Sequence, residues 1–424
     1  MIYKTLDQLS LAKKLSIDDI VYSSMFSPDD QVKKKTSQII YQQAKDNQSP
    51  PASIHNFYLA AGKGEIKGFT VPAMNIRTLT YDTARIIFRL AKKHKIGALI
   101  FEIAKSEQGY TDQKPSLYAV AVLAAAVKEK YKGPVFLQGD HYQFKAKKFK
   151  EDRTEEINNM KKLIKESVEA GFYNIDIDGS TLVDLEQKKL SEQQRNNYEV
   201  TALMTKYIRQ LEAKGITISI GGEIGHIGGK NSTPEEFKAF MDNYLKLVKG
   251  IVGISKVSVQ TGTSHGGIVL PDGSIAKVDL DFAVLKSIGQ VARKIYHIGG
   301  PVQHGASTLP DGLFHQFPKT GTLEIHLATG FQNIVYQHLP ASLKKDMYEW
   351  VKKNCQDERK ESWNDDQFIY KMRKKALGPF KQKLWELSEK EKKPILTALE
   401  KQFEFLFKHL NVFGTKRIVE KYIH

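Results

Sequence analysis

Residues 135–142, VFLQGDHY, combine an apolar run with two adjacent polar residues at its end. The run is typical of a buried strand, and the side chains that end it are the carboxylate of Asp140 and the imidazole of His141. Both groups are costly to bury without partners. The stretch therefore predicts a buried strand whose end holds something that binds both side chains.

Strand-like runs of this kind recur between about residues 66 and 330, and helix-like stretches separate them. The eight runs are GFTVPAMNI (68–76), GALIFEI (97–103), GPVFLQGD (133–140), FYNIDID (172–178), TISIGGEI (217–224), SKVSVQTG (255–262), KIYHIGG (294–300) and TLEIHLAT (322–329). This alternation predicts an α/β fold, a (β/α)8 TIM barrel with parallel strands inside and helices outside. One helical stretch, residues 232–249, begins with a predicted capping box of Thr233 and Glu236.

The two ends of the chain lack this alternation. Residues 1–60 and 339–424 show helical periodicity, which predicts helical N- and C-terminal extensions to a barrel domain of residues 61–338. The stretch NQSPPAS (47–53) is predicted to be a linker, because two prolines and small polar residues resist both helix and sheet.

The composition narrows the class of protein. No stretch of the 424 residues approaches the ~18 apolar residues that span a bilayer, so we expect a cytoplasmic protein without a membrane partner. The single cysteine, Cys355, excludes an intrachain disulfide, so a metal site must use histidines and carboxylates. The net charge of +16 suits either nucleic acid or a phosphorylated substrate. The lysines of the chain are scattered and are not interleaved with stacking aromatics, which is typical of a solvated surface.

Polar residues gather where the predicted strands end, at the face of a barrel where catalytic loops converge. They are Asp140, His141, Asp178, Ser180, Glu223, His226, His265 and His304. Histidine and carboxylate ligands suit Zn²⁺ or another borderline divalent ion, and a catalytic site uses three protein ligands and leaves one position open. His141, His265 and His304 are the predicted ligands.

Two of these histidines lie in glycine-rich turns, TGTSHGG (261–267) and GGPVQHGAS (299–307). Small residues let backbone N–H groups approach an anion closely, and such turns can hold a phosphate without a lysine. The two turns therefore predict a phosphate close to the metal.

Taken in order over about residues 66–332, these motifs resemble the class II, metal-dependent ketose-bisphosphate aldolases, including the fructose- and tagatose-bisphosphate enzymes. The matching motifs are GFTVPAMNI, GDH, DIDGS, GGEIGHIGG, GTSHGG with VDLDF following, VQHGAS and LAT. The resemblance implies a homodimer or homotetramer of (β/α)8 barrels. It also implies cleavage of a ketose 1,6-bisphosphate to dihydroxyacetone phosphate and an aldehyde.

The resemblance also implies roles for single residues. Asp140 falls on the acid/base that exchanges a proton with the C4 hydroxyl, and His141, His265 and His304 fall on the ligands of Zn²⁺. Asp178 and Glu223 fall on acidic positions associated with a second divalent or a monovalent cation. The residues that fall at the substrate, mostly on the loops for its dihydroxyacetone phosphate end, are Gly266, Gly305, Ser307, Thr329, His326 and Ser180.

The chain departs from the family pattern at several positions. His326 stands where the family has asparagine, and Ala104 where it has a serine. The loop acid that moves the C3 proton has no evident counterpart in GGKNSTPEE (228–236), where Glu235 and Glu236 are explained as helix-capping residues.

Two other functions compete with the aldolase interpretation. Residues 101–115, FEIAKSEQGYTDQKP, resemble the non-catalytic accessory subunits of tagatose-bisphosphate aldolase, although such a subunit has no chemical need of the histidines and Asp140. A basic nucleic-acid-binding protein would explain the charge, but it leaves the strand-end acids and histidines unexplained.

Overall fold

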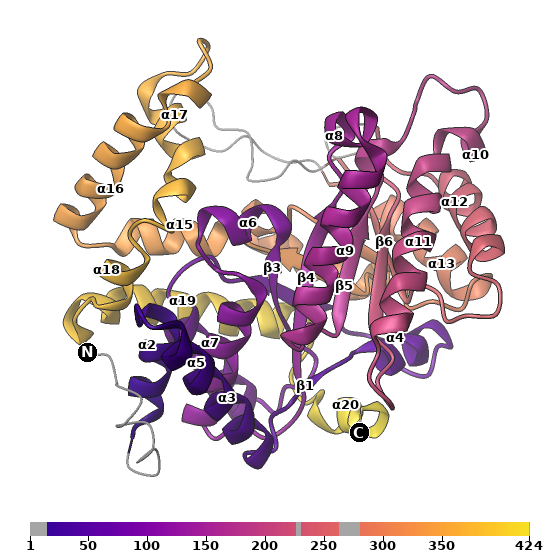
Figure 1. The fold of residues 1–424 in the computed structure, drawn as a ribbon. Helices are drawn as coiled ribbons and strands as arrows, with labels where there is room; N and C mark the ends of the chain where they lie inside the picture. The colour runs from indigo at the N-terminus through magenta and orange to yellow at the C-terminus, as the bar shows by residue number, and fades with distance from the viewer. Residues whose placement is uncertain (1–14, 226–229, 263–279, 424) are drawn as a thin grey trace.

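Eight parallel strands close into a barrel in the computed structural model, which describes residues 15–225, 230–262 and 280–423 (Figure 1). Each strand pairs with the next one along the chain, and β9 pairs with β2 to complete the ring. The strands are β2 (Val71–Asn75), β3 (Ile100–Ala104), β4 (Val135–Gln143), β5 (Asn174–Asp178), β6 (Ser219–Glu223), β7 (Lys256–Val259), β8 (Pro301–Gln303) and β9 (Glu324–Leu327). The predicted (β/α)8 barrel is confirmed.

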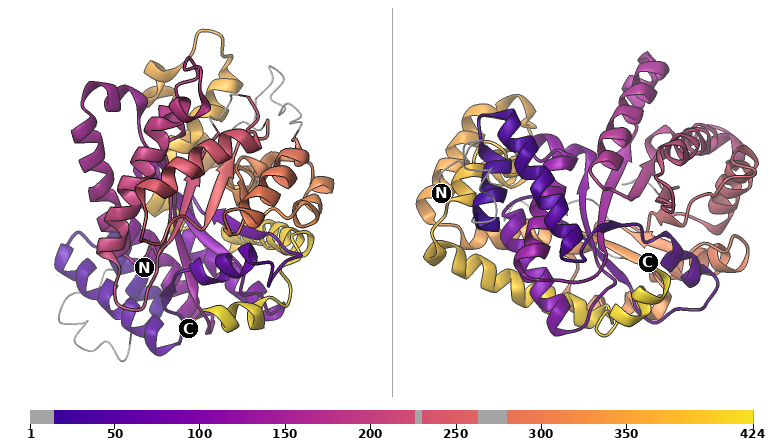
Figure 2. Two further views of the ribbon diagram at one scale, coloured as in Figure 1. Left: turned by 90° about the vertical axis from the view of Figure 1, so that its right-hand side faces the viewer. Right: turned by 60° about the horizontal axis from the view of Figure 1, so that its bottom comes forward.

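Helices surround the barrel, as the two views of Figure 2 show. They are α4 (His55–Gly62), α5 (Thr80–Lys93), α6 (Lys105–Tyr110), α7 (Pro115–Lys128), α8 (Ala146–Glu151), α9 (Arg153–Glu169), α10 (Leu190–Gln193), α11 (Arg195–Leu211), α12 (Pro234–Leu247), α13 (Phe282–Lys294), α14 (Gln316–Thr320) and α15 (Thr329–His338), with 3-10 turns η2 (Ser180–Leu182), η3 (Ala306–Thr308) and η4 (Asp311–Leu313). Helix α12 starts at the predicted capping box, where the Glu236 carboxylate accepts from the Thr233 N–H at 2.9 Å.

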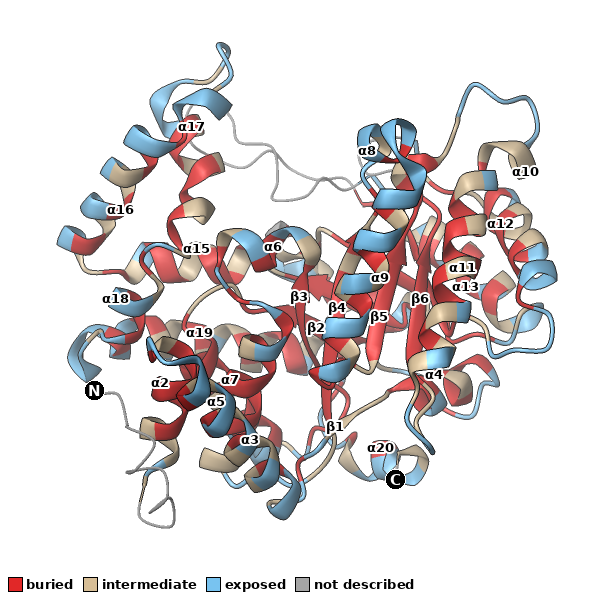
Figure 3. Cartoon of the chain, viewed as in Figure 1, coloured by how far each residue is buried: buried red, intermediate tan, exposed pale blue. Residues whose placement is uncertain are grey.

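The chain on either side of these elements is helical and packs on the barrel helices. The elements are α2 (Ile17–Phe26), α3 (Asp30–Asp46), α16 (Ala341–Asn354), η5 (Gln356–Glu358), α17 (Asp365–Met372), η6 (Arg373–Ala376), α18 (Lys381–Trp385), α19 (Glu389–His409) and α20 (Lys416–Tyr422). Helices α2 and α3 pack on α7, α19 lies against α5 and α15, and α20 contacts α4. Buried residues concentrate in the strands and on the helix faces that meet them (Figure 3). None of the described helices is both long enough and apolar enough to cross a membrane.

The stretch predicted to be a linker contains a short strand instead. Strand β1 (Pro51–Ala52) pairs in parallel with the first two residues of β4. The Asn174 side chain fixes it there, because its Nδ2 donates to the Ala52 carbonyl at 3.1 Å and its Oδ1 accepts from the Ile54 N–H at 2.9 Å. The linker prediction is wrong because proline is tolerated at the first position of a strand and on an edge strand, where its missing N–H group is not needed for pairing.

The seventh strand-like run is also misplaced. Residues 294–300 form the end of α13 and a turn, and the strand is the three residues of β8 that follow. Ile295, an apolar residue of that run, is 52% exposed. Gly300 has a φ of 136°, a conformation that ends the turn and favours glycine, so the strand starts only at Pro301.

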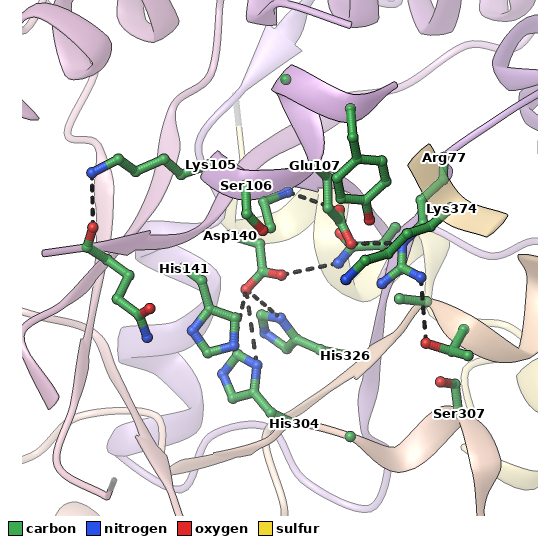
Figure 4. A pocket seen from close by; sticks show the side chains of 18 of the residues that line it. Arg77, Lys105, Ser106, Glu107, Asp140, His141, His304, Ser307, His326 and Lys374 are labelled. Atoms are coloured by element: carbon green, nitrogen blue, oxygen red, sulfur yellow. Dashed lines mark hydrogen bonds and ion pairs between the residues drawn. The ribbon is translucent and has the colours of Figure 1, made fainter. Parts of the chain in front are cut away.

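A bulge in β4 explains how adjacent residues reach one site. The pairing of β4 with β5 shifts between Gly139 and Tyr142, and His141 has a φ of 42° in the left-handed region. In a regular strand neighbouring side chains point to opposite faces. The bulge breaks that alternation, so Asp140 and His141 both face the mouth of the barrel (Figure 4).

Candidate metal and substrate site

A cavity of about 550 Å³ opens at the carboxyl ends of the strands. Its lining includes seven of the predicted site residues, namely Asp140, His141, His304, Gly305, Ser307, His326 and Thr329 (Figure 4). The cavity therefore brings together the predicted acid/base, two predicted metal ligands and residues of the predicted phosphate loops. His265 and Gly266, also predicted for this site, lie outside the described residues.

Asp140 is held by a hydrogen bond to each of its carboxylate oxygens. Asn75 Nδ2 donates to Oδ2 at 2.9 Å, and His326 Nδ1 lies 3.0 Å from Oδ1. Burial alone would raise the pKa of Asp140, but the charges of His141 and His326 outweigh burial and hold this pKa well below its usual range. Asp140 is therefore an ionised carboxylate in a fixed orientation at the cavity.

His141 is oriented by the two acids that end the next two strands. Its Nδ1 lies 2.9 Å from Asp178 Oδ2 and 3.0 Å from Glu223 Oε2. Burial alone would raise the pKa of Asp178, but the hydrogen bond to His141 outweighs burial and lowers this pKa to about 2. Burial and the charge of Asp178 raise the pKa of Glu223 to about 8. One of the two acids is thus ionised and the other protonated near neutral pH. Both were predicted as cation ligands, and their described partner is the imidazole that faces the cavity.

Ser180 stands behind this pair. Its hydroxyl and its backbone N–H donate to Asp178 Oδ1 at 2.6 and 2.9 Å. Ser180 was predicted to contact the substrate. In this structure it holds the carboxylate of Asp178, which in turn orients the ring of His141.

The donor groups at the mouth fit a divalent metal ion. Asp140, His141 and His304 each offer a ligand atom, and these atoms lie within 4.8 Å of one another. The rings of His141 and His304 have centroids 4.1 Å apart, and His304 Nδ1 lies 3.9 Å from Asp140 Oδ1. Zinc binds imidazole nitrogen at ~2.0–2.1 Å and carboxylate oxygen at a similar length, so donors at these separations could share one ion with small adjustments.

The other end of the cavity carries the turn and helix start predicted to hold phosphate. Gly305 has a φ of 72°, which favours glycine, and it precedes η3 with Ser307. Thr329 begins α15, and its Oγ1 lies 3.3 Å from a guanidinium nitrogen of Arg77. Backbone N–H groups, two hydroxyls and a guanidinium are all suitable donors to an anion at this end.

His326 lies beneath the mouth and contacts four acids, of which Asp176 is the most distant at 3.7 Å from Nε2. Its Nδ1 is 3.0 Å from Asp140 and 3.1 Å from Glu102, and its Nε2 is 2.7 Å from Glu324. The ring also packs on His304, with centroids 4.0 Å apart. His326 therefore lines the cavity floor, where it was predicted to contact substrate, and it also positions Asp140.

Below His326 lies a group of buried charges that we call the inner layer: Glu102, Asp176, Lys256 and Glu324. Lys256 Nζ donates to Glu324 at 2.6 Å, to Asp176 at 3.0 Å and to the Gln138 side chain. Burial alone would raise the pKa of Glu324, but the charge of Lys256 outweighs burial and lowers this pKa to about 2. Burial raises the pKa of Asp176 to about 6 and that of Glu102 to about 8. No residue of the inner layer lines the cavity.

Several lining residues escaped the sequence interpretation. Asn75 is the last residue of β2 and Arg77 lies two residues after it, so the strand-end rule that found the other residues would have found them too if applied to the first run. Lys374 comes from η6, far beyond the barrel in sequence, and no local motif marks it.

Comparison with known proteins relates this site to described families. The family model for class II fructose-bisphosphate aldolase matches residues 59–384. A fructose-bisphosphate aldolase from Campylobacter jejuni aligns over 85% of this chain and 94% of its own, with 16% identity and a TM-score of 0.49. A probable tagatose 6 phosphate kinase from Sinorhizobium meliloti 1021 aligns over 83% and 99%, with 13% identity and a TM-score of 0.54, and shows the fold alone.

A curated relative matches only a short segment. It is the FMN-dependent NADH:quinone oxidoreductase 2 of Jannaschia sp. (strain CCS1), 33% identical over an alignment of 104 residues that covers 22% of this chain. The chain spans about half, 49%, of the length of that relative. The family model, by contrast, covers most of the barrel and every strand-end residue described above, so the chain belongs to the class II fructose-bisphosphate aldolase family.

Proposed function

We propose that this protein is a zinc-dependent aldolase that reversibly cleaves a ketose 1,6-bisphosphate, of the fructose or tagatose type, to dihydroxyacetone phosphate and an aldehyde. One observation carries the proposal. In a chain of the class II aldolase family, two predicted zinc ligands, His141 and His304, lie beside the predicted acid/base Asp140 at the cavity, with one polar atom of each within 4.8 Å of the others. When bound there, a zinc ion would supply a Lewis acid to the ketose carbonyl.

Asp140 is the residue for proton transfer. As the C3–C4 bond breaks, it accepts the proton of the C4 hydroxyl, and the C4 oxygen becomes the carbonyl oxygen of the aldehyde. The electron pair of the broken bond stays with the other half as an enediolate, and C3 then takes a proton from water to give dihydroxyacetone phosphate. The low pKa of Asp140 keeps it ionised for this step, and Asn75 and His326 fix its two oxygens. In the direction of synthesis the same carboxyl returns the proton.

The remaining residues bind and orient. Gly305, Ser307 and Thr329 supply donors for the phosphate of the dihydroxyacetone phosphate half, and the net charge of +16 favours an anionic substrate. Asp178 and Glu223 hold the ring of His141 toward the cavity, and they are also the residues available to a second divalent or a monovalent cation. The proposal includes assembly as a homodimer or homotetramer, which rests on the family resemblance.

The test combines metal analysis with a substrate panel. We expect the purified protein to contain zinc, to cleave at least one ketose 1,6-bisphosphate, to lose this activity to a chelator and to regain it with zinc. Cleavage that survives complete metal removal would contradict zinc dependence. Bound metal without cleavage of any ketose bisphosphate would instead support the interpretation as an accessory subunit. Affinity for nucleic acid without bound metal would support the interpretation as a basic nucleic-acid-binding protein.

A further inference from the structure

A second cavity, of about 510 Å³, lies at the end of the barrel opposite the mouth. Its lining includes residues 132–134, just before β4, and 215–217, just before β6, so it opens where strands begin. Residues between the end of α3 and the start of α4, and the end of α20, complete the wall, and Figure 1 shows β1 and α20 together at this end. The cavity shares no lining residue with the one at the mouth, and its volume is in the range of small-molecule sites.

The wall between β1 and α4 is held in place by hydrogen bonds to the strands. Asn174 Oδ1 accepts from the Ile54 N–H at 2.9 Å. Ser53 Oγ accepts from the N–H groups of His55 and Ser219, both at 3.1 Å. The Ser53 hydroxyl proton therefore points away from these two groups, and it has no acceptor among the described residues. Because Ser53 lines the cavity, its hydroxyl is a fixed donor available to a ligand.

His55 is a polar residue of the same wall that lacks a full set of partners. It lines the cavity and is 3% exposed, and its Nδ1 has no hydrogen-bond partner among the described residues. An unsatisfied buried nitrogen is costly, and in folded proteins a bound water or ligand commonly supplies the missing partner. His55 therefore indicates a polar wall that a bound molecule would complete.

Two lysines give this cavity a positive charge. Lys45 lies in the last turn of α3 and Lys132 just before β4, and neither ammonium group makes an ion pair or a hydrogen bond with another described residue. Glu420 is the only acid among the described lining residues, and Lys416 pairs with it at 3.7 Å. Two unpaired ammonium groups match a phosphate monoester, with a charge of about −1.5 to −2 near neutral pH, better than a single carboxylate.

The rest of the lining suits the organic part of such a ligand. Pro51, Pro134, Ile216 and Tyr422 contribute apolar and aromatic surface to the cavity. Small-molecule sites typically combine surface of this kind with a few polar groups that fix the orientation of the ligand. The two lysines, Ser53 and His55 are the polar groups here.

We propose that this second cavity binds a small organic phosphate, with the phosphate at Lys45, Lys132 and Ser53 and the organic part against the prolines and Tyr422. Because the cavity lies at the other end of the barrel, its ligand binds without displacing a substrate at the mouth. The inference does not depend on the proposed function.

Calorimetric titration of the full chain tests the ligand class with two matched pairs, glucose 6-phosphate against glucose and AMP against adenosine. We expect at least one phosphate to bind, and its unphosphorylated partner to bind at least about 10-fold more weakly. Lys45→Met and Lys132→Met should each weaken binding of that phosphate by roughly 5- to 10-fold, because each removes a partly solvated charge. The exposed Lys214→Met, beside the cavity but outside its lining, is the control and should leave the affinity unchanged.

Three outcomes would overturn the inference: failure of both phosphates to bind, equal affinity within both pairs, or unchanged affinity in both lysine variants. The pair that shows the larger difference distinguishes a sugar phosphate from a nucleotide.

The ring of His55 reports which cavity is occupied. Its C–H signals in nuclear magnetic resonance spectra, assigned as those lost in His55→Gln, should shift along the binding curve of the phosphate. Ser307→Ala at the mouth should leave that curve unchanged, whereas Lys132→Met should move it to higher ligand concentration. A phosphate that shifts the signals of His304 but not those of His55 binds only at the mouth, and this result would refute the second site.

Discussion

The barrel holds two sets of buried charges that differ in what surrounds them. The mouth layer, Asp140, His141 and His304, lines a cavity of about 550 Å³. The inner layer of Glu102, Asp176, Lys256 and Glu324 contacts that cavity nowhere, and Lys256 is completely buried and donates to three neighbours. The buried Lys256 ammonium, paired with Asp176 and Glu324, serves the fold, whereas charges grouped around a cavity are available to a ligand.

The largest effect on activity is expected from the mouth layer. Asp140→Asn removes the proton acceptor but keeps the shape of the side chain, so turnover should fall by about 10²–10⁴-fold. Zinc content and the free energy of unfolding should stay close to those of the unaltered protein, and the exposed Asp346→Asn should change none of the three. If the variant instead loses its metal in proportion to its activity, Asp140 is a ligand and the comparison between proton transfer and metal binding breaks down.

The inner layer should show the opposite pattern. Lys256→Met leaves the carboxylates of Asp176 and Glu324 buried without their cation, and removal of one partner from such a group typically destabilises by about 3–5 kcal/mol. Denaturant unfolding would measure this loss, and Lys286→Met, an exposed lysine on α13, should change stability by less than about 0.5 kcal/mol. A stable Lys256→Met protein with reduced turnover would show that the inner layer acts in catalysis.

A third buried group, at the start of α4, sharpens the comparison because it has no acid beside it. His55 is 3% exposed, and its Nδ1 has no hydrogen-bond partner among the described residues. Burial and the charge of Arg209 lower the pKa of His55 from 6.5 to about 4. The folded state thus binds this proton less readily than the unfolded state. Stability is full above pH 6.5 and falls as the pH drops toward 4, by on the order of 3 kcal/mol.

Replacement of His55 tests whether this histidine causes the predicted loss of stability at low pH. His55→Gln cannot titrate, so the difference in unfolding free energy between pH 7.5 and pH 4.5 should shrink relative to the unaltered protein. The exposed His297→Gln serves as the control and should leave the pH dependence unchanged. Parallel pH profiles for His55→Gln and the unaltered protein would show that another group causes the acid sensitivity.

The barrel could be predicted from the sequence because seven of its eight strand-like runs coincide with strands, each bounded by polar or glycine-rich turns. Asp140 and His141 could be placed from the end of their strand-like run, and His304 from its position after the seventh run, although the strand before it begins only at Pro301. The bulge that turns Asp140 and His141 to one side depends on the register with β5, which no local pattern of residues 135–142 reveals.

The sequence of two strands indicates the inner layer, although the sequence analysis did not predict it. Glu324 and His326 alternate in β9, as Asp176 and Asp178 do in β5, and residues two apart on a strand share a face. Polar alternation inside otherwise apolar strands therefore indicated charges within the barrel. Lys374 left no such signal, because its place in the site depends on how the C-terminal helices fold back over α6.

The two residues of β1 set a limit on how far the chain can be shortened. They cover the part of β4 that lies below its pairing with β5, which begins only at Gln138 and Asn174. A fragment cut to the family-matched residues 59–384 would uncover the backbone N–H and C=O groups there and would take from Asn174 its partners at Ala52 and Ile54. Uncovered strand edges recruit other chains. An expression fragment intended to stay monodisperse should therefore begin before residue 51, even though the recognisable family signature begins later.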